Sequence, residues 1–387
     1  MHRLALFPLS GDPIHYGHLY VIEEASRTFE QVLVYVSEND EKMGSYLLDL
    51  PTRTAMVERA IRDRDLENVR VIGGTDLLVD VYLRENCDAI VRGVRDSRDK
   101  EYEIRMFQYH ESILPGISEH LHFIDTGSTV APISSTVVKV LASRHVDVSY
   151  MVPLCAKAAL EEAMHSQFRL AVTGQMGVGK TTVIRQIMRA VCSKGLPVSY
   201  ISFDDLVRRV YQEDTPGAQA VRDDIRDNID QAAVSRDGKE VNREWIKEHA
   251  SLEHLELLQK WTTPHVFRLL REELGKARGL VLIEWSQFAE EGLTQLCNHN
   301  VLVIHSSARD AFLEQRGVSD HVRFRFGQLQ WDVNKCTKTL MDRAHRDHYG
   351  QVLCHNNLPG GDITGLMESI FEMFPTLRGV NIDRRRR

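Results

Sequence analysis

Short, mostly apolar runs alternate with longer segments of helical period along this chain, and that alternation restricts the possible folds more than any other feature of the sequence. Such runs are typical of strands buried on both faces of a parallel sheet, and the segments between them are long enough for crossover helices. The pattern therefore predicts an α/β architecture with parallel sheets. The predicted strands cover residues 4–7, 32–36, 69–72, 89–91, 169–173, 198–201, 280–283 and 301–304.

The alternation pauses between residues 152 and 167, and this pause predicts two domains. Residues 156–163 are rich in Ala, Leu and Glu, so they are expected to form a helix at the junction. We place the boundary after that helix, which gives domains of residues 1–165 and 166–387, close to the ~100–200 residues of ordinary domains. The longest helical stretch, residues 243–276, is expected to form an insertion beside the second sheet.

Charge, cysteine spacing and hydropathy argue against several classes of protein. Lys and Arg number 48 against 55 Asp and Glu, so the net charge of −7 gives no reason to expect a nucleic-acid partner. The six cysteines lie far apart without metal-ligand spacing, which favours a reducing compartment. No apolar run reaches the ~18–20 residues of a membrane span, so we expect a cytoplasmic protein without a membrane partner. The Arg-rich tail at 383–387 is interpreted as a solvated terminus.

A phosphate-binding loop opens the second half. Residues 174–182 read Gly-Gln-Met-Gly-Val-Gly-Lys-Thr-Thr and match GxxxxGK[ST] between a predicted strand and a predicted helix, the context that this motif requires. Its glycines let backbone N–H groups surround phosphate oxygens, and the Thr181 hydroxyl is placed to bind the Mg2+ that accompanies ATP. The expected nucleotide-binding residues are Gly174, Gly177, Gly179, Lys180, Thr181 and Thr182.

Two carboxylates follow the next strand of this domain. Asp204 and Asp205 come after residues 198–201, at the carboxyl edge of the sheet, where α/β proteins bind their ligands. Aspartate also favours helix N-caps, so we expect Asp204 to cap the next helix and Asp205 to be catalytic. Several later arginines are candidates for a mobile basic lid over the phosphates. They are Arg316, Arg323, Arg325, Arg343 and Arg346.

The first half has a histidine loop after its first strand. Residues 10–18 read Ser-Gly-Asp-Pro-Ile-His-Tyr-Gly-His, and a helix is predicted from about Gly17. The helix dipole keeps a histidine at this position near neutral, or the histidine donates to phosphate when it is protonated. Gly17 lets a nucleotide approach the backbone.

Three other segments of the first half add donors at the same predicted sheet edge. Residues 134–136 open a helix with successive hydroxyls and free N–H groups, which can bind phosphates. Arg92 and Arg95 follow the fourth predicted strand, and Lys42 follows the second. These cationic side chains and hydrogen-bond donors suit a displacement reaction at a phosphorus atom of an anionic nucleotide.

Over residues 2–163 these segments resemble bacterial phosphopantetheine adenylyltransferases. Arg-Gly-Val-Arg at 92–95 and Glu-Tyr-Glu at 101–103 distinguish that family from other nucleotidyltransferases, which share the histidine loop and the Ser-Ser-Thr helix start. The resemblance implies a Rossmann-like nucleotidyltransferase fold. It also implies that the phosphate of 4'-phosphopantetheine attacks the α-phosphorus of ATP, which releases pyrophosphate and gives dephospho-CoA. Further matching segments are 12–14, 17–18, 75–78, 133–139 and 147–148.

The same resemblance implies roles for individual residues. Ser10 and His18 would contact the reacting α-phosphate, and Lys42 and Arg92 would orient the phosphate of 4'-phosphopantetheine. Leu78 would line the pantetheine channel. Relatives of this half form homo-oligomers, so the N-terminal domain is the candidate region for self-association. The residues expected to hold ATP are Gly93, Arg95, Glu103, Ser134, Ser135 and Thr136.

Residues 168–374 resemble dephospho-CoA kinase more distantly, through the phosphate loop, the pair Asp205 and Arg209, and Glu290. The resemblance implies a P-loop kinase-like domain in which Asp205 is the base for the ribose 3'-hydroxyl, while Arg209 and Glu290 bind the acceptor. Further matching features are Pro216-Gly217 and Asn356-Asn357.

Taken together, the two resemblances imply a bifunctional enzyme that converts 4'-phosphopantetheine to dephospho-CoA and then phosphorylates it to CoA with ATP and Mg2+. Two alternatives remain open. His15 is more typical of nicotinamide mononucleotide adenylyltransferases, which would pair here with a nucleoside kinase. Pro264-His265 reverses the His-Pro order of dephospho-CoA kinases, which suits a P-loop domain that senses ATP or CoA without turnover.

Overall fold

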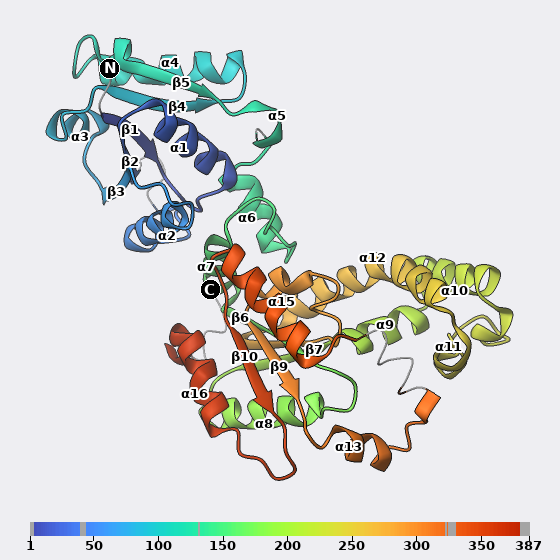
Figure 1. Cartoon of the computed structure of the whole chain (residues 1–387). Helices are drawn as coiled ribbons and strands as arrows, with labels where there is room; N and C mark the ends of the chain where they lie inside the picture. Colours follow the sequence, from blue (N-terminus) through green and yellow to red (C-terminus); the bar gives the residue numbers. More distant parts are fainter. Residues whose placement is uncertain (1–3, 39–43, 131, 322, 324–329, 380–387) are drawn as a thin grey trace. The chain divides into compact units, whose positions relative to one another are not determined.

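A computed structural model of the chain describes residues 4–38, 44–130, 132–321, 323 and 330–379. It divides into two compact domains, Met1–His165 and Ser166–Arg387, and each is described by itself. Each domain is built on one parallel sheet with helices on both faces (Figure 1), as the alternating pattern predicts. Within the described part of the chain, no helix is both long and apolar enough to cross a bilayer.

The N-terminal sheet has the strand order β3-β2-β1-β4-β5. Its strands are β1 (Leu4–Leu9), β2 (Gln31–Ser37), β3 (Val69–Gly74), β4 (Ala89–Val94) and β5 (Leu121–Asp125). Its helices are α1 (Tyr16–Thr28), α2 (Leu50–Arg62), α3 (Leu78–Arg84), α4 (Ser97–Glu111), η2 (Ile117–His120), α5 (Gly127–Val130), α6 (Ser135–Ser143) and α7 (Leu154–His165).

Successive side chains of β2 supply the cores on the two faces of this sheet. Val32, Val34 and Val36 pack with α1 and α2, whereas Leu33 and Tyr35 pack on the opposite face with α3. Side chains alternate between faces along a strand, so a strand that is buried on both sides must be apolar at nearly every position. This explains why the run at 32–36 was recognisable from sequence.

The C-terminal sheet has the order β10-β9-β6-β8-β7. Its strands are β6 (Gln167–Thr173), β7 (Val198–Ser202), β8 (Gly279–Glu284), β9 (Val301–His305) and β10 (Val352–Asn356). Its helices are α8 (Lys180–Ser193), α9 (Phe203–Gln212), α10 (Pro216–Asn228), η3 (Gln231–Ala233), α11 (Arg243–His249), α12 (Leu252–Lys276), η4 (Leu293–Cys297), α13 (Arg309–Gln315), α15 (Val333–Arg346), α16 (Thr364–Met373) and η5 (Pro375–Gly379).

The expected insertion at 243–276 is two helices, because Ser251 caps α12 directly after α11 ends. Helices α10, α11 and α12 lie together at the side of this domain away from β10 (Figure 1). In both sheets the first strand sits beside strands reached by crossovers in opposite directions, an arrangement that opens a crevice for ligands at the carboxyl ends of the strands.

Candidate functional sites

The first candidate site is a cavity of about 630 Å³ in the N-terminal domain, at the carboxyl ends of β1, β2 and β4. Most residues predicted for the adenylyl-transfer site line it, although they come from segments far apart in the chain. Leu78 is not among the lining residues, since it packs against the core under α3. Lys42 lies outside the described residues. The predicted residues in the lining are Ser10, Gly17, His18, Arg92, Gly93, Arg95, Glu103, Ser135 and Thr136.

His15 caps α1 and supports His18. The Nδ1 atom of His15 accepts a hydrogen bond from the His18 backbone N–H at 3.3 Å, and the two rings stack with centroids 3.6 Å apart. Burial, together with the charge of Arg95, lowers the pKa of His15 to about 4. His15 is therefore neutral at physiological pH. Any substituent at Gly17 would lie 3.0 Å from the His15 ring, so this glycine accommodates the stack.

Arg92 reaches the cavity from the end of β4 and is held by two acceptors. Its Nε donates to Glu103 Oε2 at 2.6 Å, and its Nη1 donates to the Pro8 carbonyl at 3.5 Å. The Arg92 side chain is 28% exposed and the Glu103 side chain 17% exposed, so the guanidinium is accessible from the cavity. A Cβ at the next residue, Gly93, would lie 2.6 Å from a methyl group of Val21, so the strand can approach α1 this closely only because a glycine stands there.

The N-terminus of α6 forms another wall of this cavity. Ser134 is the N-cap, and its side chain accepts from the Val137 N–H. The Ser135 hydroxyl donates to the Pro13 carbonyl at 3.0 Å, whereas Thr136 is exposed. One turn on, Lys139 donates to the Asp12 carboxylate at 2.9 Å. A helix N-terminus with a nearby ammonium group is suited to bind phosphate.

The second candidate site is the phosphate loop between β6 and α8. Gly174, Gly177 and Gly179 have φ values of +142°, +86° and +83°. A Cβ at Gly174 would lie 2.1 Å from the Ile304 carbonyl oxygen, so no other residue fits there. Asn357, on the loop after β10, donates to the Val178 carbonyl at 2.9 Å and secures the loop from the side.

Lys180 is folded back onto this loop. Its Nζ donates to the carbonyls of Gly174 and Gln175, at 2.9 Å and 3.2 Å. Burial lowers the pKa of Lys180, and the negative charges of Glu284 and Asp204 oppose that shift. Thr181 and Thr182 follow in the first turn of α8, where Thr181 is half-buried and Thr182 is exposed.

The carboxylates after β7 are arranged differently from the expectation. Ser202, not Asp204, caps α9, because its hydroxyl accepts from the Asp205 N–H at 3.3 Å. The cap prediction for Asp204 was therefore wrong: a serine one residue before the helix takes that place. The Asp205 side chain is 53% exposed and pairs with Arg208 at 2.6 Å.

Glu284 is a residue that the sequence analysis missed. It ends β8, beside the strand that leads into the phosphate loop, and its carboxylate accepts from the Tyr200 hydroxyl. Its negative charge is also the largest of the effects that raise the pKa of Lys180 against the effect of burial. The signal was present in the sequence, since Glu284 follows the apolar run at 280–283 as Asp204 follows the run at 198–201.

These oxygen donors fit a magnesium ion that arrives with a nucleotide. Mg2+ prefers oxygen ligands and is usually bound through one or two carboxylates plus phosphates rather than by an all-protein cage. Thr181, Asp204 and Glu284 supply a hydroxyl and two carboxylates near Lys180. The described residues include no cluster of three His, Cys, Asp or Glu side chains that could hold a metal ion.

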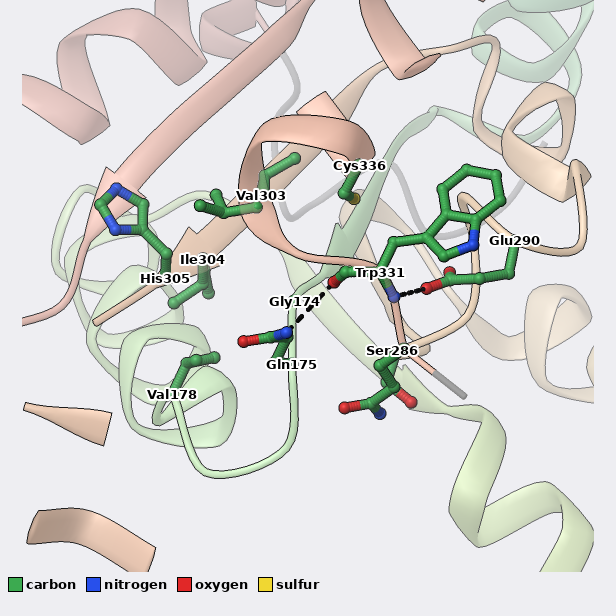
Figure 2. Close-up of a pocket in the computed structure, with 12 residues that line it drawn as sticks. Gly174, Gln175, Val178, Ser286, Glu290, Val303, Ile304, His305, Trp331 and Cys336 are labelled. Atoms are coloured by element: carbon green, nitrogen blue, oxygen red, sulfur yellow. Dashed lines mark hydrogen bonds between the residues drawn. The ribbon is translucent and has the colours of Figure 1, made fainter. Parts of the chain in front are cut away.

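Glu290 lines a small pocket next to the phosphate loop (Figure 2). Its Oε1 accepts from the Trp331 N–H at 2.8 Å, and the Trp331 carbonyl accepts from Gln175 of the loop at 3.2 Å. Burial raises the pKa of Glu290. In the described part of the chain Glu290 Oε2 has no hydrogen-bond partner. The side chain thus links to the loop segment through Oε1, while Oε2 is buried.

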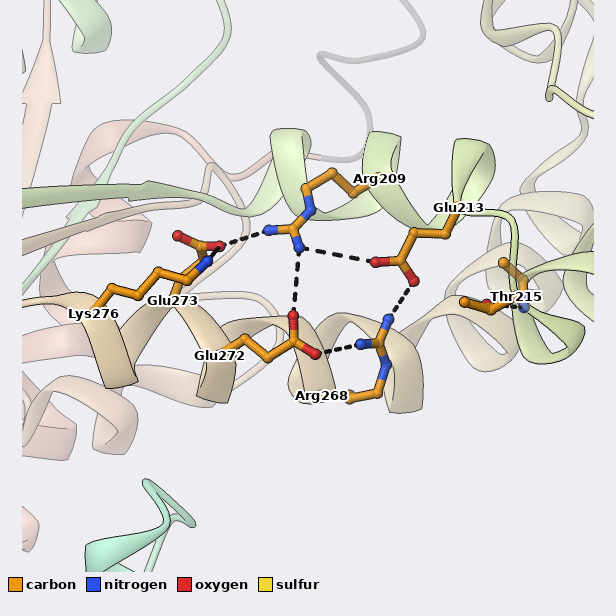
Figure 3. A network of polar contacts seen from close by, with 8 residues as sticks. Arg209, Glu213, Thr215, Arg268, Glu272, Glu273 and Lys276 are labelled. Carbon is orange, nitrogen blue, oxygen red and sulfur yellow. Dashed lines mark hydrogen bonds and ion pairs between the residues drawn. The ribbon is translucent and has the colours of Figure 1, made fainter.

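Arg209 lies in an ion-pair network between α9 and α12 (Figure 3). Its guanidinium is 2.7 Å from Glu273, 3.5 Å from Glu272 and 3.8 Å from Glu213. Arg268 of α12 pairs with Glu213 and Glu272 from the other side. The positive charge predicted to bind an acceptor therefore already faces three carboxylates, and the acceptor-binding role stays a prediction.

The arginines predicted for a lid do not share one environment. The positive charges of Arg316 and Arg309 help to lower the pKa of Lys180. Arg309 Nε also donates to the Met176 carbonyl at 2.9 Å. Arg343 donates to the Ala289 carbonyl at 2.6 Å. Arg325 lies outside the described residues. Arg309 is thus a further cation at the phosphate loop that the sequence analysis did not select. The two remaining arginines predicted for the lid pair with aspartates: Arg323 with Asp320, and Arg346 with Asp347.

Comparison with known proteins identifies the N-terminal half. Residues 10–140 match the cytidylyltransferase-like family model. The phosphopantetheine adenylyltransferase of Pasteurella multocida is 37% identical over 156 residues, which are 40% of this chain and 95% of that protein. That of Syntrophomonas wolfei is 35% identical over 162 residues, 42% of this chain and 97% of that protein.

Among solved structures, TT1252 from Thermus thermophilus aligns at 22% identity with a TM-score of 0.39, over 54% of this chain and 98% of that one. The two phosphopantetheine adenylyltransferases match much better, because nearly their whole length aligns with this chain at more than one-third sequence identity. Through its N-terminal domain, the chain belongs to the phosphopantetheine adenylyltransferase family.

Proposed function

We propose that the chain is a bifunctional enzyme of coenzyme A biosynthesis. Its N-terminal domain transfers the adenylyl group of ATP to 4'-phosphopantetheine, and its C-terminal domain phosphorylates the product, dephospho-CoA, on the ribose 3'-hydroxyl. The observation that carries the first step is the cavity in which His18, Arg92 and the N-terminus of α6 converge. The names of the relatives in the N-terminal half support the same substrate.

In the first step, a phosphate oxygen of 4'-phosphopantetheine attacks the α-phosphorus of ATP while the bond to the bridging oxygen breaks, and pyrophosphate leaves. No side chain has to form a covalent intermediate. His18 and Ser10 donate to the α-phosphate, on which negative charge builds up, and Arg92 orients the attacking phosphate. Positioning and charge stabilisation of this kind supply most of the catalysis in displacement at phosphorus.

In this arrangement His15 serves the reaction without contacting the phosphates. Because it is neutral and stacked, it keeps the His18 ring in one orientation and adds no charge of its own. The N-terminus of α6 holds the β- and γ-phosphates, which become the pyrophosphate leaving group. Glu103 restrains Arg92 through the 2.6 Å ion pair.

In the second step, the 3'-hydroxyl attacks the γ-phosphorus and ADP leaves. The phosphate loop binds ATP, and Lys180 moves from its own carbonyl partners to the β- and γ-phosphates. Thr181, with Asp204 or Glu284, would hold Mg2+, which would neutralise charge on those phosphates. Asp205 accepts the hydroxyl proton, and Glu290 binds the acceptor.

The decisive experiment is incubation of the full chain with 4'-phosphopantetheine, ATP and Mg2+, followed by mass spectrometry of the products. CoA is expected. If dephospho-CoA alone accumulates, the C-terminal domain is a nucleotide sensor or a kinase for another acceptor. If nothing forms but nicotinamide mononucleotide is adenylylated, the acceptor assignment is wrong.

A further inference from the structure

Arg53, on α2, is the largest fully buried side chain among the described residues. Its Nη1 donates to the Ser10 carbonyl at 2.5 Å and to the Ser37 carbonyl at 3.0 Å, and its Nε donates to the Leu48 carbonyl at 3.1 Å. The Tyr46 ring lies over the guanidinium, 4.1 Å from its carbon. A buried guanidinium is costly unless its N–H groups are satisfied, and here backbone carbonyls satisfy them.

The carbonyls bound by Arg53 belong to three separate parts of the adenylyl-transfer cavity. Ser10 follows β1, Ser37 ends β2, and Leu48 closes the segment 45–48, whose residues Ser45 and Tyr46 line the cavity with Ser10 and Ser37. One side chain therefore fixes the distances between the nucleotide loop, the neighbouring strand end and the facing wall.

Asp12 holds segment 45–48 from its other side. Its carboxylate accepts from the N–H groups of Leu47 and Leu48, both at 3.1 Å, and pairs with Lys139 of α6. Leu48 is thus bound through its carbonyl by Arg53 and through its N–H by Asp12. Through Asp12, segment 45–48 is anchored both to the loop that leads into α1, which contains His18, and to α6, the helix that faces the phosphates.

Charge gives Arg53 a second effect on the cavity. Among the described residues only Glu38 forms an ion pair with it, at 3.4 Å, and the Glu38 side chain is 34% exposed. A weakly neutralised positive charge beneath the cavity attracts the phosphates of ATP, since a buried charge is poorly screened by solvent.

We propose that Arg53 is a positioning residue for adenylyl transfer, holding Ser10 and segment 45–48 in the geometry that brings the attacking phosphate to the α-phosphorus. This inference rests on the proposed first reaction. Lysine cannot replace Arg53, because one ammonium group cannot bridge three carbonyls that lie in different directions.

The test compares Arg53→Lys in the full chain with the matched control Arg59→Lys. Arg59 is on the same helix, is 44% exposed, and pairs with Asp63 at 3.7 Å. We measure kcat and KM for dephospho-CoA formation, ATP affinity by calorimetry, and thermal unfolding. For folded Arg53→Lys we expect kcat to fall by about 10- to 100-fold and ATP to bind about 5-fold more weakly. Arg59→Lys should match the wild type in every measurement.

Wild-type kcat and ATP affinity in folded Arg53→Lys would overturn the proposal. If that variant does not fold, Tyr46→Leu replaces it; the expected loss in kcat is then about 3- to 10-fold, and wild-type kcat rejects the positioning role. If the wild type makes no dephospho-CoA, the proposed function fails by itself. The ATP affinity of Arg53→Lys then decides the inference: weaker binding supports it, and unchanged binding contradicts it.

Discussion

The imidazole rings of His15 and His18 are stacked, with their planes inclined by 20° and their centroids 3.6 Å apart. His15 at the same time accepts from the His18 N–H, so one residue orients both the backbone and the side chain of its neighbour. Such a double contact requires a neutral His15, because a protonated ring has no acceptor nitrogen. The stability of the histidine loop is therefore linked to pH.

The first prediction concerns that linkage. The pKa of His15 is about 4 in the folded chain, against about 6.5 for a free histidine, so the unfolded state binds the proton more tightly. The contribution of this group to stability is complete above about pH 6.5 and is lost as pH falls toward 4, by at most about 1.4 kcal/mol per pH unit. The protection factors of α1 amides, which are corrected for the intrinsic exchange rate at each pH, should fall on acidification from pH 6.5 to 5. They should fall less in His15→Asn, which keeps an N-cap acceptor; an equal fall in both proteins would assign the effect to another group.

The second prediction separates the two reactions. His18→Ala should lower dephospho-CoA formation by about 100-fold or more, because it removes a donor to the α-phosphate, and should leave phosphorylation of added dephospho-CoA unchanged. Lys180→Ala should do the reverse. Both activities are followed by mass spectrometry, with circular dichroism to establish folding. Loss of both activities in either folded variant would contradict two independent sites.

A third prediction ranks the carboxylates at the phosphate loop. Glu284→Gln keeps the shape and the Tyr200 contact but removes the charge that faces Lys180, so it should lower the rate of phosphorylation by about 100-fold and raise the Mg2+ concentration needed for tight ATP binding. Tyr200→Phe, which removes only the hydroxyl, should have an effect of about 3- to 10-fold. Calorimetric titration of ATP at several Mg2+ concentrations is the measurement. Metal-independent ATP binding in Glu284→Gln and wild type alike would exclude Glu284 from the magnesium site.

The fourth prediction uses two glycines with positive φ. A Cβ at Gly174 would lie 2.1 Å from the Ile304 carbonyl, whereas a Cβ at Gly195 has nothing within 4 Å. Gly195→Ala should therefore cost only the backbone strain of about 1–2 kcal/mol. Gly174→Ala should be more destabilising and should abolish ATP binding to the C-terminal domain. Thermal unfolding with and without ATP tests both, and equal shifts for the two variants would mean that β9 can move away from the loop.

The sequence by itself determined the α/β class and eight of the strands. Six of them lie inside their sheets, where a strand that is buried on both faces has to be apolar along its length. It missed β5 and β10, which lie at the edges of their sheets and are only partly buried. Histidine is tolerated in both, as His122 and His355, and interrupts the apolar signal. Edge strands need apolar residues on less of their surface, so their apolar signal is weaker, although the edge strands β3 and β7 were predicted.

The phosphate loop and the histidine loop could be recognised because each is contiguous, so that spacing along the chain equals spacing in the site. The tertiary structure decided the rest. Arg53 meets Ser10 across 43 positions of the chain, Asp12 meets Lys139 across 127, and Tyr200 meets Glu284 across 84. Local pattern does not encode such pairings, since they form only when crossover connections bring the carboxyl ends of separate strands to one edge of a sheet.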